Sequence, residues 1–165
     1  MATARHPRTM LRALVLLLVL ASPATAQDWR LMEDRAFGYS VPIPSSYDLS
    51  LRAEGGNSRL YHNAGGDILA VWAGRLEDRS FADAVRDRRR QDEDRGWNVS
   101  YERVTREWAS YSGTKGNQIR YVRAIRYCGD RTAFFLIDYD AAEKNRYDPL
   151  VTHMVRNMKP TAGCR

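Results

Sequence analysis

Apolar residues fill almost every position between Thr132 and Tyr139, whereas other stretches of the chain alternate. Because successive side chains of a strand point to opposite sides, Phe134 and Leu136 would lie on one face of a strand here. The other face would carry Ala133, Phe135, Ile137 and Tyr139. A strand that is apolar on both faces is typical of the middle of a sheet that is covered on each side. We therefore expect this stretch to form the central strand.

Shorter stretches alternate between apolar and polar residues and predict the other strands. The first, around Tyr39, is interrupted by Pro42 and Pro44, which cannot donate hydrogen bonds to a neighbouring strand. A hairpin is predicted where residues 59–62 and 67–73 flank a turn rich in Asn and Gly. Further strands are expected at residues 47–51, 98–104, 107–112 and 118–128, with turns at residues 113–117 and 129–131.

A first helix is predicted from Ser80 to Gly96. Ser80 is followed three residues later by Asp83, a capping-box spacing that satisfies free amide groups at a helix start. The apolar residues lie in the first turns, so the second half of this helix is expected to face water. Three consecutive arginines, 88–90, each have an acid four residues later, which predicts that they are neutralised in place. An anion-binding patch is the alternative interpretation.

The last helix is predicted to begin with Asp148 as its N-cap and Pro149 at the first helical position, where a missing amide hydrogen is harmless. Pro160 would end it. One apolar stripe would be formed by Leu150, Val151, Met154, Val155 and Met158. His153 falls opposite this stripe, so we expect it to face solvent.

The first 26 residues have the pattern of a secretory signal peptide. Three arginines precede an uncharged apolar run at residues 13–21, and Ala24-Thr25-Ala26 supplies the small residues of a cleavage site. The run is shorter than the ~20 residues of a spanning helix. We therefore expect cleavage after Ala26, one α+β domain over residues 27–165, no stable membrane insertion after cleavage, and a periplasmic or secreted location.

Removal of this segment changes the charge of the protein. The segment holds three arginines and no acid, so its loss would lower the formal net charge of +6 to +3. This gives little electrostatic support to nucleic-acid binding. The two cysteines, Cys128 and Cys164, predict one disulfide in an oxidising compartment. A last helix that returns beside the strand following Cys128 would bring the two together, as such a bridge requires.

The order of landmarks resembles the PsbP/Mog1-like superfamily over about residues 37–160. The landmarks are the opening "FGYSVPIPSSY", the hairpins, the mid-chain helix, the strand "FFLIDYD" and the closing "YDPLVTHMVRNM". The resemblance implies an antiparallel sheet of about six to eight strands with helices on both faces, an α/β/α sandwich. It also implies an exported, non-enzymatic binding or assembly module of the cell envelope, with an envelope protein or a small ligand as partner. No functional residue is carried over.

Asp138 and Asp140 form one candidate polar site, since both fall on one face of the predicted central strand. Paired carboxylates can serve acid/base catalysis or bind a cation, which would suit a small hydrolase or a ligand-binding enzyme. His62 and His153 have no metal-ligand spacing, so we expect no metal site, no cofactor and no catalytic set.

A second candidate site is an exposed turn over residues 112–117. Trp108 and Tyr111 lead into it, Ser112 opens it and Lys115 stands at its tip. It is similar to the loop that some bacterial lysozyme inhibitors insert into the enzyme, which would make the protein an inhibitor. The letters S-x-x-K also occur here, but the predicted turn does not provide the helical context of an acylating serine.

Overall fold

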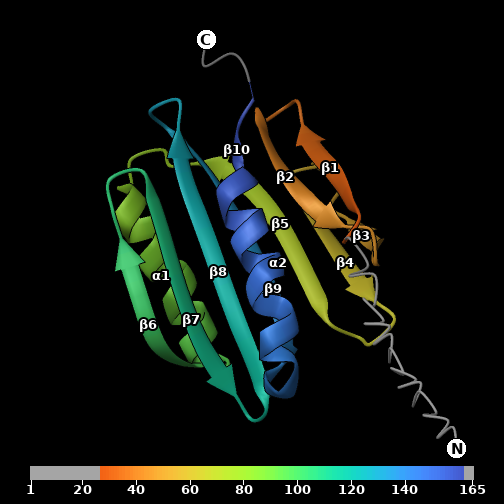
Figure 1. The fold of residues 1–165 in the computed structure, drawn as a ribbon. Coiled ribbons are helices and arrows are strands. Elements are labelled where there is room, and N and C mark those ends of the chain that lie inside the picture. Colours follow the sequence, from red (N-terminus) through yellow and green to blue (C-terminus); the bar gives the residue numbers. More distant parts are fainter. Residues whose placement is uncertain (1–26, 162–165) are drawn as a thin grey trace, which may run out of the picture.

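The computed structural model describes residues 27–161, so the predicted signal peptide and Cys164 lie outside the described range. A seven-stranded sheet dominates this range, in the order β3-β4-β5-β9-β8-β7-β6 (Figure 1). Each strand is antiparallel to its neighbour. The strands are β3 (Tyr47–Arg52), β4 (Ser58–Asn63), β5 (Ile68–Arg75), β9 (Arg131–Asp140), β8 (Gln118–Tyr127), β7 (Trp108–Lys115) and β6 (Asn98–Val104).

A smaller sheet and two helices cover the large sheet. The small sheet has the order β1-β2-β10 and consists of β1 (Trp29–Asp34), β2 (Tyr39–Pro44) and β10 (Lys159–Pro160). Together with helix α2 (Lys144–Asn157) it packs on one face of the large sheet, and helix α1 (Phe81–Asp94) packs on the other (Figure 1). No helix within residues 27–161 has the length and apolar character needed to cross a bilayer.

Strand β9 lies in the middle of the large sheet, as its apolar pattern predicts. Phe134 and Leu136 are buried on the α1 side. Ala133, Phe135, Ile137 and Tyr139 are buried on the side of α2 and the small sheet. The prediction of a two-sided central strand is therefore confirmed, and so is the α+β class with helices on both faces.

Each face of the large sheet is covered over only part of its width. On the α1 side, Phe81 and Val85 of α1 pack against apolar residues of β7 and β8. On the same side Leu60 and Ile68 are only half-buried, and Leu51 of β3 is 61% exposed. Within the described chain, α1 thus leaves the outer half formed by β3, β4 and β5 without a helix above it.

Helix α2 starts earlier than the sequence indicates, and the prediction of Asp148 as its N-cap was wrong. Asp140 instead caps the short 3-10 turn η1 (Ala141–Glu143), accepting from the backbone N–H of Ala142 at 2.8 Å, and α2 continues from Lys144. Pro149 lies inside the helix. The reason is tertiary: Tyr147, in the first turns, is fully buried and stacks on Tyr139 at 4.2 Å. Burial of this ring offsets the hydrogen bond that proline removes.

The apolar stripe of α2 is confirmed, since Leu150, Met154 and Met158 are buried. His153, however, does not simply face solvent. It is half-buried and stacks on Trp29 at 4.1 Å.

The predicted disulfide stays a prediction, because Cys164 lies outside the described residues. Cys128 opens the turn between β8 and β9 with φ of 51° and packs against the core. The described tail ends nearby: the Thr161 N–H donates to the Gly38 carbonyl at 2.9 Å, and Arg131 donates to the adjacent Phe37 carbonyl at 3.1 Å. The tail and the start of β9 therefore meet at the same loop.

Candidate functional site

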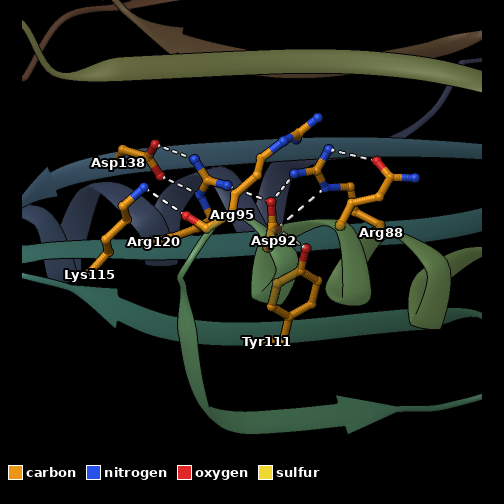
Figure 2. A network of polar contacts seen from close by, with 8 residues as sticks. Arg88, Asp92, Arg95, Tyr111, Lys115, Arg120 and Asp138 are labelled. Carbon is orange, nitrogen blue, oxygen red and sulfur yellow. Dashed lines mark hydrogen bonds and ion pairs between the residues drawn. The ribbon is translucent and has the colours of Figure 1, made fainter.

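Asp92, near the end of α1, is a fully buried carboxylate that receives hydrogen bonds from three side chains (Figure 2). The Tyr111 hydroxyl donates at 2.5 Å and Arg120 Nη1 donates at 2.5 Å. Arg88, one helical turn before Asp92, adds its guanidinium. These donors replace the water that a buried carboxylate loses.

Arg120 on β8 connects Asp92 to a second buried carboxylate. Its Nε donates to Asp138 Oδ1 at 2.8 Å and its Nη2 donates to Asp138 Oδ2 at 2.6 Å, a bidentate pair. The guanidinium also lies over the Trp97 ring, 4.1 Å from the centroid. Two arginines and two aspartates thus form a charge-balanced network that joins α1 to the centre of the sheet.

Strand register and helix spacing bring these residues together. Arg120 and Asp138 lie directly opposite each other in the β8–β9 pair, so their side chains share a face. Arg88 and Asp92 are four apart in α1 and meet on one side of the helix. Burial raises the pKa of the Tyr111 hydroxyl, opposed by the neighbouring Arg88 and Arg120. The phenol therefore keeps its proton at neutral pH and donates a hydrogen bond to Asp92.

A groove of about 470 Å³ lies beside this network, on the half of the sheet that α1 leaves bare. We call it the α1-side groove. Its apolar wall consists of Leu51, Leu60, Ile68, Ala70, Trp72 and Leu136. Its polar end is formed by Arg88, Arg95, Arg120 and Asp138. Its volume is within the range of pockets that hold small ligands.

Arg95 gives the polar end an unbalanced positive charge. Its carbonyl accepts from Lys115 Nζ at 2.7 Å, but its guanidinium makes no hydrogen bond or ion pair with a described residue. Figure 2 shows this side chain extending between Arg120 and Arg88 with its guanidinium pointing away from Asp92. Because the network beneath it is neutral overall, Arg95 makes the groove end cationic.

Asp138 and Asp140 do not act as a pair of free acids. Asp138 is buried in the network and holds Arg120 through both of its oxygens. Asp140 caps η1 and accepts from Asn117 at 2.6 Å. Only Asp138 lines the groove.

The prediction of an exposed turn at residues 113–117 was wrong, because β7 continues to Lys115 and only Gly116 and Asn117 turn. Tyr111 is buried towards α1, and Trp108 packs against the core on the opposite face. Gly113, which suggested a turn, is required by a close approach instead: a Cβ there would lie 2.6 Å from the Asn98 carbonyl oxygen.

The remaining candidates of that stretch are also strand residues. Ser112 is half-buried and lies opposite Tyr121 in β8, while Lys115 is exposed and lies opposite Gln118 at the end of the hairpin. Neither therefore belongs to a long protruding loop.

The prediction that the second half of α1 faces water was also wrong at Asp92. The four-residue spacing pairs Arg88 with Asp92, but it neither places the pair in the interior nor indicates Arg120. One signal was present: residues 81, 85, 88 and 92 follow the spacing of a helix's buried stripe. Likewise Arg120 shares its strand face with the buried Val122 and Ala124.

Within residues 27–161, no group of three or more His, Cys, Asp or Glu side chains is placed to hold a metal ion. His62 pairs through Nδ1 with the Ser50 hydroxyl at 2.9 Å. The buried aspartates of the network are occupied by arginine and tyrosine donors.

Two solved structures share the arrangement of these elements. The Saccharomyces cerevisiae Ran-binding protein Mog1p matches with a TM-score of 0.59 and 12% identity, over 82% of this chain and 96% of that chain. The cyanobacterial PsbP (CyanoP) of Synechocystis sp. PCC 6803 matches with a TM-score of 0.60 and 11% identity, over 87% of this chain and 98% of that chain. This chain has the PsbP/Mog1-like fold.

The PsbP/Mog1-like fold is what this likeness establishes, in agreement with the resemblance of the sequence landmarks. No family model matches the sequence, and no curated protein matches it either. The function must therefore be argued from the groove and the surface of this chain itself.

Proposed function

We propose that this protein is an exported, non-enzymatic binding module of the cell envelope, and that the α1-side groove holds a small amphipathic anion. One observation carries the proposal. A groove of about 470 Å³ combines a continuous apolar wall with a cationic end at Arg95, whose guanidinium has no ionic partner in the described chain. Apolar lining with a few convergent polar groups is the usual composition of a ligand site.

The chemistry of the two ends defines the ligand. An apolar body would pack against Leu60, Ile68 and Trp72 on the wall. A carboxylate would pair with Arg95, which offers a planar fork of donors that matches its two oxygens. Arg120 is already engaged by Asp92 and Asp138, so it supports the site without contributing a free charge.

The same geometry favours binding over hydrolysis. A hydrolase that used Asp138 and Asp140 would need both acids at one reacting centre. Here each acid has its own partner, Arg120 for Asp138 and Asn117 for Asp140, and only one of them reaches the groove. The inhibitor alternative loses its main support, because residues 112–115 lie in β7 and not in a protruding loop.

Calorimetric titration with decanoate tests the proposal, with decanol as the uncharged comparison. We expect decanoate to bind, and Arg95→Gln to weaken it by about tenfold, the loss of one charge-assisted contact. Arg90→Gln is the matched control, because Arg90 in α1, like Arg95 at the C-cap of this helix, is exposed and has no ion pair to a described residue. Equal affinity for decanol and decanoate, or an unchanged Arg95→Gln affinity, would contradict the proposal.

A further inference from the structure

The second bare area of the large sheet lies on the opposite face from the α1-side groove. There α2 and the small sheet cover the β4, β5, β9 and β8 side, and β6 and β7 extend beyond them (Figure 1). The residues that β6, β7 and the adjoining part of β8 present on that face are strongly patterned. We call this surface the Arg-Trp face, and it consists of Tyr101, Arg103, Trp108, Ser110, Tyr121 and Arg123.

Strand register aligns the Arg-Trp face in rows. Arg103 lies opposite Ser110, and Ser110 lies opposite Arg123, so these three side chains cross the sheet on one face. Tyr101 and Tyr121 flank them in the next row, and Tyr101 is 48% exposed. Because all of these residues stand on paired strands, their spacing is fixed by the sheet.

Two arginines on this surface, Arg103 and Arg123, lie over the same aromatic ring, that of Trp108. The guanidinium carbons of Arg103 and Arg123 lie 5.2 Å and 4.3 Å from the centroid of Trp108. Neither arginine forms an ion pair within the described chain. Arg123 donates to the Ser110 hydroxyl at 3.1 Å, and its Nε is buried without a hydrogen-bond partner.

Arg123 is partly withdrawn from water, which increases the value of a counter-charge. Desolvation by burial lowers the pKa of its guanidinium, the expected response of a cation that has lost hydration. An anion arriving here forms its ion pair in a medium of lower effective dielectric than open solvent. The surface is therefore electrostatically complementary to a carboxylate-bearing partner.

The Arg-Trp face continues into an apolar groove beside α2. Tyr121 belongs to both, and the groove is about 410 Å³, with Val151 and Val155 of α2 on its far side. Arg156 stands at this groove and also forms no ion pair with a described residue. A partner that spans the surface would thus meet Arg103 and Arg123 on the sheet and Arg156 at the groove. The one acid that lines this groove, Asp148, is already paired with Lys144.

We propose that the Arg-Trp face and the adjoining α2 groove bind an acidic, partly apolar segment of another protein. Its carboxylates pair with Arg103 and Arg123, and its apolar residues lie against Tyr121 and the α2 groove. Arginine, tyrosine and tryptophan are the residues that dominate the energetics of protein interfaces. A nucleic acid fits less well, because its affinity depends on many phosphate contacts and this face offers few cations.

Fluorescence anisotropy with a short fluorescein-labelled peptide that alternates glutamate with leucine tests this proposal. The comparison peptide carries glutamine in place of glutamate. We expect the glutamate peptide to bind at least about tenfold more tightly. Arg103→Gln, at an exposed position, and Arg123→Gln should each reduce this preference. A peptide that binds equally well in both forms, or variants that bind like the parent protein, would overturn the proposal.

Arg95→Gln is the matched control, because it lies on the other face of the sheet and should leave peptide binding unchanged. Conversely, Arg103→Gln should leave decanoate binding unchanged, so the failure of either proposal is distinguishable from the failure of the other. The segment assignment is also overturned if oligothymidylate or a sulfated polysaccharide binds more tightly than the glutamate peptide at about 0.15 M salt.

Discussion

At the scale of single residues, Asp92 shows how a charged side chain becomes part of an interior. It has no exposed surface, yet Arg88, Arg120 and Tyr111 all donate to it. Removal of Asp92 would leave Arg88 without its counter-ion and Arg120 with Asp138 alone, which is more damaging than the loss of one hydrogen bond.

We expect Asp92→Ala to lower the free energy of unfolding by about 3 to 5 kcal/mol, because Arg88 would lose its counter-ion in the interior and the Tyr111 hydroxyl its acceptor. Urea denaturation followed by tryptophan fluorescence measures this change. Asp94→Ala is the control: Asp94 is exposed on the same helix without an ion pair to a described residue, so a change within about 0.5 kcal/mol is expected. Equal effects of the two substitutions would show that the network does not stabilise the fold.

The sequence contained part of this network. Four-residue spacing predicts the pairing of Arg88 with Asp92, but hydrophobic periodicity counts only apolar residues as buried and therefore predicts a surface position for the pair. The partner that keeps Asp92 inside, Arg120, is 28 residues away along the chain. Its contact depends on how α1 lies across β8, which local spacing does not determine.

At the scale of elements, β7 shows that one glycine has two possible meanings. The sequence pattern predicts that Gly113 is part of a turn, whereas the structure places it where β6 and β7 approach closely. The real turn needs only Gly116 and Asn117, since Gly116 adopts a φ of 59°. A glycine in the sequence indicates that its position has a special backbone requirement. It does not indicate whether that requirement is a turn or a close approach of two strands.

We expect Gly113→Ala to destabilise the protein by about 1 to 3 kcal/mol, because its Cβ would meet the backbone of Asn98 and Val99, and β6 must move. Thermal unfolding monitored by circular dichroism measures the effect. Gly74→Ala in β5 is the control, since a Cβ there has no heavy atom within 4 Å and should be tolerated. A Gly113→Ala protein as stable as the Gly74→Ala protein would contradict the close approach.

At the scale of the whole molecule, buried tyrosines link stability to alkaline pH. Burial raises the pKa of Tyr127 to about 12, and burial together with the hydrogen bond to Asp67 raises that of Tyr147 to about 12. Above the ordinary tyrosine pKa of about 10, the unfolded chain releases these protons while the folded chain retains them. The unfolded state then binds fewer protons, so stability falls as pH rises.

We expect each of these tyrosines to contribute a loss of up to about 1.4 kcal/mol per pH unit between pH 10 and pH 12. Urea unfolding midpoints at pH 8, 10 and 11 measure the total slope. Tyr127→Phe should be less stable at pH 8, because the hydroxyl donates to the Phe37 carbonyl, and should show a shallower alkaline decline. An unchanged slope in this variant would contradict the assignment.

The whole-molecule architecture was largely predictable, since the two-sided pattern of β9 and the landmark order both indicate a covered sheet. The lateral position of each helix was not. The period of α1 indicates which of its faces is apolar, but the strands beneath it are selected by contacts such as Arg120 with Asp92. For that reason neither bare area, nor the surfaces proposed on them, could be predicted from the sequence.

The incomplete cover on the two faces has a consequence for stoichiometry. Arg120 and Arg123 are three residues apart on β8 and therefore point to opposite sides of the sheet, one towards each proposed site. The two sites are separated by the thickness of a sheet, so a ligand at one does not exclude a partner at the other. The protein would then act as an adaptor that forms a ternary complex, with the β8 strand as the rigid connection between its two occupants.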